Sequence, residues 1–149
     1  MTLNTVRLIS VLSTAVAMSA GFAHLLALPN KITLPRVDYL VVQQIYRGWA
    51  LLGIAVIGAL VSTLILTVMV RANQKMFYLT LTATTCIALS LVVFFLFTYP
   101  ANQQTLNWTM LPENWQELRR QWEYSHATGA GLYFIALSTL TLSLLVERT

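Results

Sequence analysis

Charged residues are scarce in this sequence, and their scarcity excludes most soluble folds. Only 9% of the 149 residues are Asp, Glu, Lys or Arg, whereas 57% are hydrophobic. A soluble domain carries about 25% charged residues. The sequence therefore predicts an integral membrane protein with lipid as its surroundings. The formal net charge of +4 is not gathered into a basic stripe, so we expect no nucleic-acid partner.

Cysteine is almost absent as well. Cys86 is the single cysteine, so the chain forms no internal disulfide and contains no Cys/His cluster with the spacing of a zinc site. The sequence also lacks a phosphate-binding loop, a dinucleotide-binding glycine motif and an HExxH metal motif. These absences give no support to a hydrolase or to a nucleotide cofactor.

Long apolar runs are what the sequence has instead. A helix needs about 20 apolar residues to cross a hydrocarbon core of roughly 30 Å. Four runs reach that length, at residues 6–28, 47–70, 76–98 and 126–146. We therefore predict an all-α fold, an antiparallel four-helix membrane bundle that forms one domain over residues 1–149. We expect Pro29 and Pro100 to end the first and third spans.

The first apolar run also has features of a secretory signal peptide, with Arg7 before it and Ala20 and Ala23 near its end. Its length favours a retained transmembrane helix. Four spans place both termini and the 71–75 turn on one side of the membrane, and both long polar intervals on the other. Basic residues number four and five on the two sides, so the count does not decide the orientation. We expect a bacterial inner-membrane protein with both termini in the cytoplasm, because the basic residues of the other side stand beside acidic ones.

The polar interval 99–126 contains a predicted amphipathic helix at residues 112–125, which we expect to lie at the membrane interface between the third and fourth spans. At 100° per residue, one face of it carries Trp115, Arg119, Trp122 and His126, and the opposite face carries Glu113, Glu117, Arg120 and Tyr124. We predict that the aromatic face packs onto the bundle and that Glu117 and Arg120 lie in solvent. The alternative is a helix that rests on lipid headgroups. Glu123 has a simple partner in Arg119, four residues earlier.

Two histidines are predicted to meet at one membrane surface. His24 ends the first span on a stripe of small residues, which favours close helix packing, and His126 begins the fourth span. Ionisable groups inside a membrane are candidates for a functional site, although a lone histidine is also often a structural residue. With Glu123, the two imidazoles are a candidate set for one transition metal such as iron, copper or zinc. A site that requires no cofactor is the other possibility.

Three stretches bring a family resemblance: HLLALPNK at 24–31, QQIYRGWALLG at 43–53, and PANQQTLNWT with LRRQWEYSHA across 100–127. Together they resemble the anthrone-oxygenase-like family of small four-helix membrane proteins. The resemblance implies oxidation of anthrones to anthraquinones with molecular oxygen. It also implies that the matching positions line a site for a flat, apolar, phenolic substrate; these are His24, Asn107, Trp108, Trp115, Arg119, Trp122 and His126.

The residues suggest roles in a reaction that needs no cofactor. A neutral His24 or His126 is a candidate general base for an acidic C–H bond, and Arg119 is a candidate to stabilise the developing oxyanion. We expect the tryptophans to stack the rings and Asn102 or Asn107 to orient the carbonyl. Further predicted substrate contacts are Asn30, Tyr46, Arg47, Trp49 and Tyr99.

A different class of function is also open. The chain could be a non-enzymatic binding or assembly subunit that contacts a lipid, a quinone or a protein partner, and a homo-oligomer fits either class. The two histidines discriminate between the classes. If both face one pocket, the site hypothesis is favoured; if they face lipid or separate surfaces, the binding hypothesis is favoured.

Overall fold

Helices account for the whole regular structure of residues 2–146, which are the residues that the computed structural model describes. The long ones are α1 (Leu3–Lys31), α3 (Gly53–Met69), α4 (Gln74–Val93) and α6 (Trp115–Val146). The short ones are α2 (Arg36–Gln43), η1 (Gln44–Tyr46), η2 (Trp49–Leu52), η3 (Phe94–Thr98) and α5 (Tyr99–Gln104). No strand occurs in this range, so the prediction of an all-α fold is confirmed.

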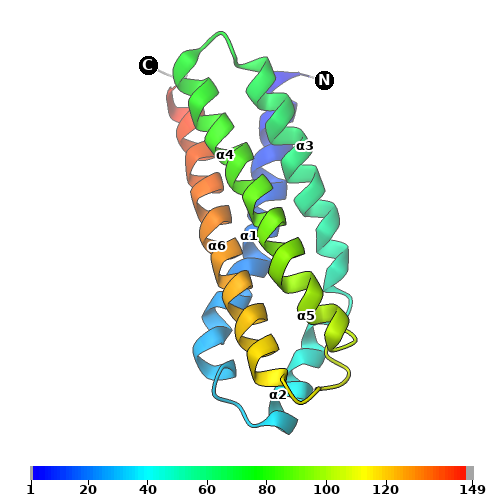
Figure 1. The fold of residues 1–149 in the computed structure, drawn as a ribbon. Coiled ribbons are helices and arrows are strands. Elements are labelled where there is room, and N and C mark those ends of the chain that lie inside the picture. Colours follow the sequence, from blue (N-terminus) through cyan, green and yellow to red (C-terminus); the bar gives the residue numbers. More distant parts are fainter. Residues whose placement is uncertain (1, 147–149) are drawn as a thin grey trace.

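Four helical stretches are long and apolar enough to cross a membrane: 3–31, 49–69, 74–104 and 115–146, with mean hydropathies from 1.7 to 2.5. They indicate an integral membrane protein. The start of α1 and the end of α6 lie at the same end of the molecule as the turn between α3 and α4, whereas α2 and α5 lie at the opposite end (Figure 1). We call the latter the α2/α5 end.

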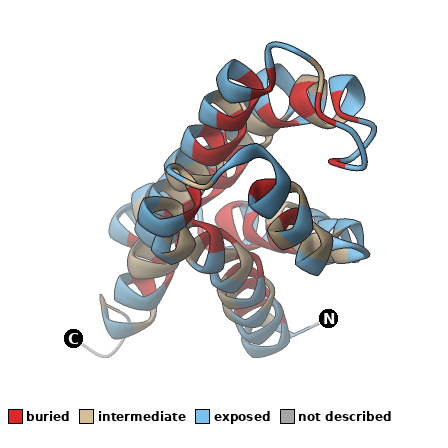
Figure 2. Cartoon of the chain, turned by 90° about the horizontal axis from the view of Figure 1, so that it is seen from below, coloured by how far each residue is buried: buried red, intermediate tan, exposed pale blue. Residues whose placement is uncertain are grey.

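Buried residues lie mainly on the helix faces that turn toward neighbouring helices, as the view from the α2/α5 end shows (Figure 2). They form two clusters. One joins α1, α3, α4 and α6 and includes Leu66, Ile87 and Leu140. The other lies at the α2/α5 end and includes Tyr39, Trp108 and Trp122. The small-residue stripe of α1 faces inward as predicted, and a Cβ on Gly21 would lie 3.1 Å from the Cα of Ala130 on α6.

The first helix ends later than predicted, because Pro29 does not stop it. Proline lacks an N–H, so it removes one helical hydrogen bond, to the carbonyl four residues earlier. Here the loss falls in the last turn of α1, and the Ile32 N–H still closes that turn on the Leu28 carbonyl at 2.9 Å. The extra turn places Lys31 at the end of the helix.

The second long helix begins later than predicted. The chain turns at Gly48, whose φ of 87° lies in the left-handed region that glycine adopts without steric cost. Regular α-helix starts only at Gly53, after the 3-10 turn η2.

Pro100 likewise fails to end the third span. The helix continues from Gln74 to Gln104 because η3 is a π-helical turn. A proline ring clashes with the carbonyl four residues earlier in an ordinary α-helix, and the wider π turn moves that carbonyl away. The continuation as α5 brings Asn102 into the interior of the α2/α5 end.

The predicted separate interfacial helix at 112–125 is wrong, because α6 is one uninterrupted helix of 32 residues from Trp115 to Val146. At 1.5 Å per residue it is about 48 Å long, so it exceeds a hydrocarbon core of roughly 30 Å by several turns. The predicted amphipathic face is confirmed. Trp115, Arg119 and Trp122 are buried, whereas Glu117 and Arg120 are exposed.

Candidate functional site

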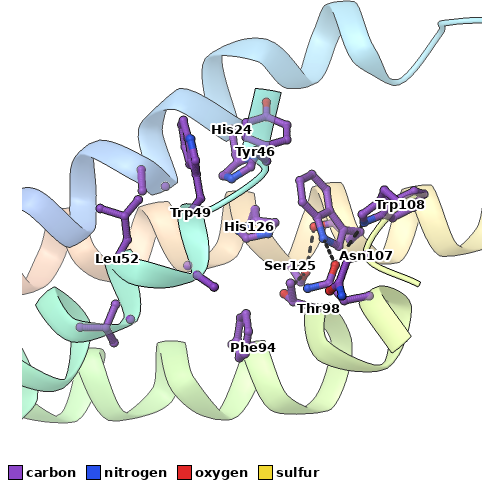
Figure 3. A pocket seen from close by; sticks show the side chains of 18 of the residues that line it. His24, Tyr46, Trp49, Leu52, Phe94, Thr98, Asn107, Trp108, Ser125 and His126 are labelled. Atoms are coloured by element: carbon purple, nitrogen blue, oxygen red, sulfur yellow. Dashed lines mark hydrogen bonds between the residues drawn. The ribbon is translucent and has the colours of Figure 1, made fainter. Parts of the chain in front are cut away.

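A cavity of about 800 Å³ lies between the two core clusters, toward the α2/α5 end. All four long helices contribute to its wall, together with the 43–53 and 106–109 segments. Figure 3 shows side chains of α1, η2, η3 and α6 turned toward this space. The lining is mostly apolar and aromatic with a few polar groups, which is the usual character of a small-molecule site.

Two stacked imidazoles form one part of the wall. The ring centroids of His24 and His126 lie 4.0 Å apart, with 18° between the ring planes. Aromatic rings surround His24: Tyr46 at 4.2 Å, Trp122 at 4.8 Å and Trp49 at 5.5 Å between centroids. Trp122 also meets His126 edge-on at 4.3 Å. The two histidines therefore face one cavity, which is the arrangement that favours the site hypothesis.

The ring nitrogens of this pair have no hydrogen-bond partner among the residues that the structure describes. His24 Nδ1 is buried and unpartnered. A buried polar group without a partner costs about 1–3 kcal/mol. We expect each imidazole to bond a side chain, a water or a metal ion, and no side chain of residues 2–146 fills that role for His24 Nδ1.

Asn102 supplies a polar group whose orientation is fixed. Its Oδ1 accepts the indole N–H of Trp108 at 3.1 Å and that of Trp122 at 2.8 Å. Indoles only donate, so the acceptor at this position must be the amide oxygen. Asn102 lines the cavity, and neither indole uses its Nδ2 donors.

The backbone beside Asn102 is strained. Leu106, Asn107 and Trp108 have φ values of 49°, 56° and 60°, three successive non-glycine residues in the left-handed region. The Asn107 N–H donates to the Asn102 carbonyl at 2.7 Å, and the Trp108 N–H donates to Thr105 Oγ1 at 3.1 Å. Such strain persists only where surrounding structure holds it, and it is common at ligand sites. It turns the Trp108 indole onto Asn102 and the cavity wall.

A buried ion pair lies behind the aromatic wall. Lys31 Nζ is 2.9 Å from Glu123 Oε1, and both side chains are almost fully buried. The ammonium also lies over the rings of Tyr46 at 4.7 Å and Trp122 at 5.0 Å. Glu123 is thus paired with Lys31, and the predicted pairing with Arg119 is wrong. The late end of α1 is the reason, since it brings Lys31 to α6.

Tyr39 and Gln43 complete this polar cluster. The Tyr39 hydroxyl donates to Glu123 Oε1 at 3.0 Å, and Gln43 Nε2 donates to the same hydroxyl. Burial, then the Glu123 carboxylate, raise the pKa of Tyr39 above its ordinary range. Gln43 also lines the cavity, so the cluster touches the site through one side chain.

Arg119 does not line the cavity, contrary to its predicted role. Its guanidinium donates to the Leu34 carbonyl at 2.8 Å and lies over the rings of Trp115 at 4.6 Å and Tyr39 at 5.3 Å. It holds the 32–35 connection against α6. Trp115 belongs to the same contact and is also absent from the cavity wall.

The other predicted substrate contacts divide in the same way. Those that line the cavity are Tyr46, Arg47, Trp49, Asn102, Asn107, Trp108 and Trp122, together with both histidines. Asn30 is exposed at the end of α1, and Tyr99 is 45% exposed on the outside of α5. The predicted residues that line the cavity come from segments that face inward at the α2/α5 end. Asn30 and Tyr99 lie on outward faces of their helices.

The geometry gives the predicted metal set no support. In residues 2–146, no group of three or more His, Cys, Asp or Glu side chains is placed to hold a metal ion. Imidazole lone pairs lie in the ring plane, so two stacked rings cannot both direct a nitrogen to one ion at about 2.0–2.1 Å. Glu123 is bonded to Lys31 and Tyr39 instead.

Sequence reasoning missed several residues of this region: Lys31, Tyr39, Gln43, Ser90, Phe94, Thr98, Ser125 and Tyr133. The first three stand in a polar interval where position gives no hint of burial. Ser125 stands in the polar interval 99–126, and the other four lie inside apolar runs, where only their helix face places them at the cavity. The 3.6-residue period of α6 would have indicated Tyr133, which lies seven residues beyond His126 and so on the same face of that helix.

No protein-family model matches this chain, and no curated protein or solved structure is similar to it. The resemblance to the anthrone-oxygenase-like family therefore stays a prediction from the sequence.

Proposed function

We propose that this protein is a membrane oxidoreductase of anthrone-oxygenase-like type, which binds a flat phenolic or quinone-like molecule in the cavity. The observation that carries the proposal is the stacked pair of His24 and His126 on an aromatic cavity wall, with ring nitrogens that no described protein group occupies. A neutral imidazole is a general base, and a carbon acid that lies against the pair gives up its proton there.

The pair accepts one proton at a time. Two positive charges 4.0 Å apart repel by about 4 kcal/mol at an effective dielectric constant of 20. The second imidazole therefore stays neutral while the first is charged, and the pair accepts the next proton after the first proton has passed to the peroxide. This property suits a reaction that removes two hydrogens from one carbon.

The reaction balances without a cofactor. One imidazole removes a proton from C10 of the anthrone, and the carbanion passes one electron to O₂. The two radicals combine to a C10 peroxide, which takes up the proton. Loss of the second C10 hydrogen as a proton, with cleavage of the O–O bond, releases water and forms the C10 carbonyl. The sum is one anthrone and one O₂ to one anthraquinone and one water.

Asn102 takes the role that the sequence assigned to Arg119. It lines the cavity, and its Nδ2 donors are not used by either indole, because both indoles bond its oxygen. Donors aimed at an oxygen that becomes negative in the transition state stabilise it most in a dry site. Trp108, Trp122 and Trp49 supply the flat surfaces against which an aromatic ring packs.

The proposed setting is an antiparallel four-helix bundle across a bacterial inner membrane, with both termini in the cytoplasm. The start of α1, the end of α6 and the α3–α4 turn share one end, which supports the antiparallel arrangement. The proposed orientation follows from the basic residues of the other end, which stand beside acidic ones, as Lys31 does beside Glu123. The cavity would then lie near the outer surface of that membrane.

The test is oxygen uptake by the purified protein in lipid nanodiscs with anthrone, together with chromatographic detection of anthraquinone. We expect turnover by the natural protein and a loss of at least 100-fold in His24→Ala and His126→Ala. Gly129→Leu should also lose activity, because Gly129 lines the cavity and a leucine there would fill part of the substrate's space. A Cβ at this position meets no atom within 4 Å, so the substitution should not disturb the fold. The matched control is Gly131→Leu, an equally unobstructed glycine that does not line the cavity.

Thermal unfolding of each variant separates chemistry from folding. Histidine variants that have the same unfolding temperature as the natural protein but turn over no substrate support the proposal. Full activity in both histidine variants would contradict it. Saturable binding without any turnover would favour the second class of function, a subunit that holds a quinone or lipid.

A further inference from the structure

The cavity has a polar part and an apolar part. Its polar lining residues gather at the α2/α5 end, where Gln43, Gln44, Arg47, Asn102 and Asn107 lie. The lining further along the helices is almost entirely apolar, and it includes Ala17, Gly21, Val56, Ile57 and Leu91. A single small ring system would leave much of this length unfilled, since 800 Å³ is near the upper end of the about 300–1,000 Å³ range for small-molecule pockets.

One side of the apolar part opens outward between α3 and α4. Residues of η2 and α3 form one wall and residues of α4 and η3 the other, and Figure 3 shows Trp49 and Leu52 on the first and Phe94 on the second. Some residues of both walls are also strongly exposed: Ile57 is 53% and Phe95 is 60% exposed. The cavity is therefore continuous with the outer surface at this point.

The surface around the opening is apolar. Leu51, Ile54 and Leu96 are each more than 60% exposed beside it. On helices that cross a membrane, such side chains contact lipid tails. Gly53 stands at the opening, and a Cβ on it would meet nothing within 4 Å. In a bilayer this side of the cavity faces the hydrocarbon phase.

We propose that the natural substrate is a two-part amphiphile: an aromatic head that lies among His24, His126 and Asn102, and one alkyl or isoprenoid chain that leaves between α3 and α4 into the lipid. This inference rests on the proposed function, because it concerns the substrate of the same site. The polar end matches the oxygens of a phenol or quinone. The apolar part and the side opening match a chain too long for a closed pocket.

The experiment compares two probes with the same head. One is 2-methyl-1,4-naphthoquinone, and the other is this ring with a chain of four isoprene units. Saturable quenching of tryptophan fluorescence in nanodiscs reports binding, since Trp49, Trp108 and Trp122 line the cavity. Concentrations are expressed as mole fractions in the lipid, which removes the effect of partitioning into the membrane.

We expect the natural protein to bind both probes with dissociation constants within about threefold of each other. Gly53→Phe should raise the dissociation constant of the tailed probe at least tenfold and change that of the tailless probe less than twofold. Gly131→Phe is the matched control and should change neither. Tenfold weaker binding of the tailed probe to the natural protein would overturn the inference, and so would an equal effect of Gly53→Phe on both probes.

The two proposals fail differently. If the protein turns over a tailless substrate but does not bind the tailed probe, the inference of an amphiphilic substrate is wrong and the proposed function still holds. Absence of saturable binding for both probes overturns the amphiphile and counts against the proposed function as well.

Discussion

Lys31 Nζ lies 2.9 Å from Glu123 Oε1, so the last residue of α1 is held directly against α6 by a buried ion pair. The contact joins residues 92 positions apart in the sequence (123 − 31 = 92) and backs the aromatic wall of the cavity. Its energetic weight depends on what remains when one partner is removed.

Glu123→Leu or Lys31→Met alone should destabilise the protein by about 3–5 kcal/mol, because each leaves one buried charge without its partner. The double variant Lys31→Met/Glu123→Leu should lose clearly less free energy of unfolding than the sum of the losses of the two single variants. Denaturant unfolding in detergent measures the cycle. Arg120→Ala, at an exposed position of α6, is the control and should stay within about 0.5 kcal/mol. Additive losses would contradict this account.

The free energy of unfolding should fall above about pH 10 because of Tyr39. The raised pKa of Tyr39 means that the folded protein keeps this proton when the unfolded chain has lost it. Below the pKa of Tyr39 in the unfolded chain, its full contribution to stability is present. Above that pKa, the contribution falls by about 1.4 kcal/mol per pH unit. Unfolding from pH 8 to 11 tests this against Tyr39→Phe. The stability difference between the two proteins should shrink above pH 10, and a constant difference would contradict the assignment.

Asn102→Leu should destabilise the α2/α5 end, because it leaves the indole N–H groups of Trp108 and Trp122 without an acceptor. The cost is about 1–3 kcal/mol for each group that stays buried. Asn102→Asp keeps an acceptor for both indoles but removes the amide donors. It should fold with natural tryptophan emission and bind quinone probes at least tenfold more weakly. Equal probe binding by Asn102→Asp would show that the amide donors serve no ligand.

Gly21→Val should destabilise the bundle by about 1–3 kcal/mol, since even a Cβ would lie 3.1 Å from the Ala130 Cα and 3.3 Å from its Cβ. The obstacle is helix backbone, so α1 and α6 must separate. Gly131→Ala should instead be neutral or stabilise by up to about 1 kcal/mol, because its Cβ meets no atom and alanine favours helix. Thermal unfolding in detergent compares the two. Equal stabilities would mean that α1 and α6 do not pack closely at Gly21.

Hydropathy predicted the four long helices well, because a membrane span is a property of one continuous run of residues. Hydropathy failed where the local backbone geometry around a proline decides where a helix ends. Pro29 and Pro100 are strong local stop signals, yet both helices pass them. Placement in a last turn compensates for the first proline, and a π-helical turn compensates for the second. Neither compensation can be read from the residues nearby.

The candidate site was predicted in part. Helical periodicity and topology placed His24, His126 and Trp122 together, since each lies on the inward face at the same end of its helix. The partner of Glu123 could not be predicted, because Arg119 is close in sequence whereas Lys31 is close only in the folded chain. Long flexible cations compete for one carboxylate, and packing decides between them.

The π-helical turn at 94–98 sets the rotational phase of the chain that follows it. One residue added to an α-helix rotates every later side chain by about 100° around the axis. The turn absorbs such an addition without a break, and Asn102 lies four residues beyond it. Deletion of one residue there would restore an ordinary helix and swing the amide away from both indoles. The π-helical turn therefore separates the helix face that packs the span from the face that carries Asn102 to both indoles.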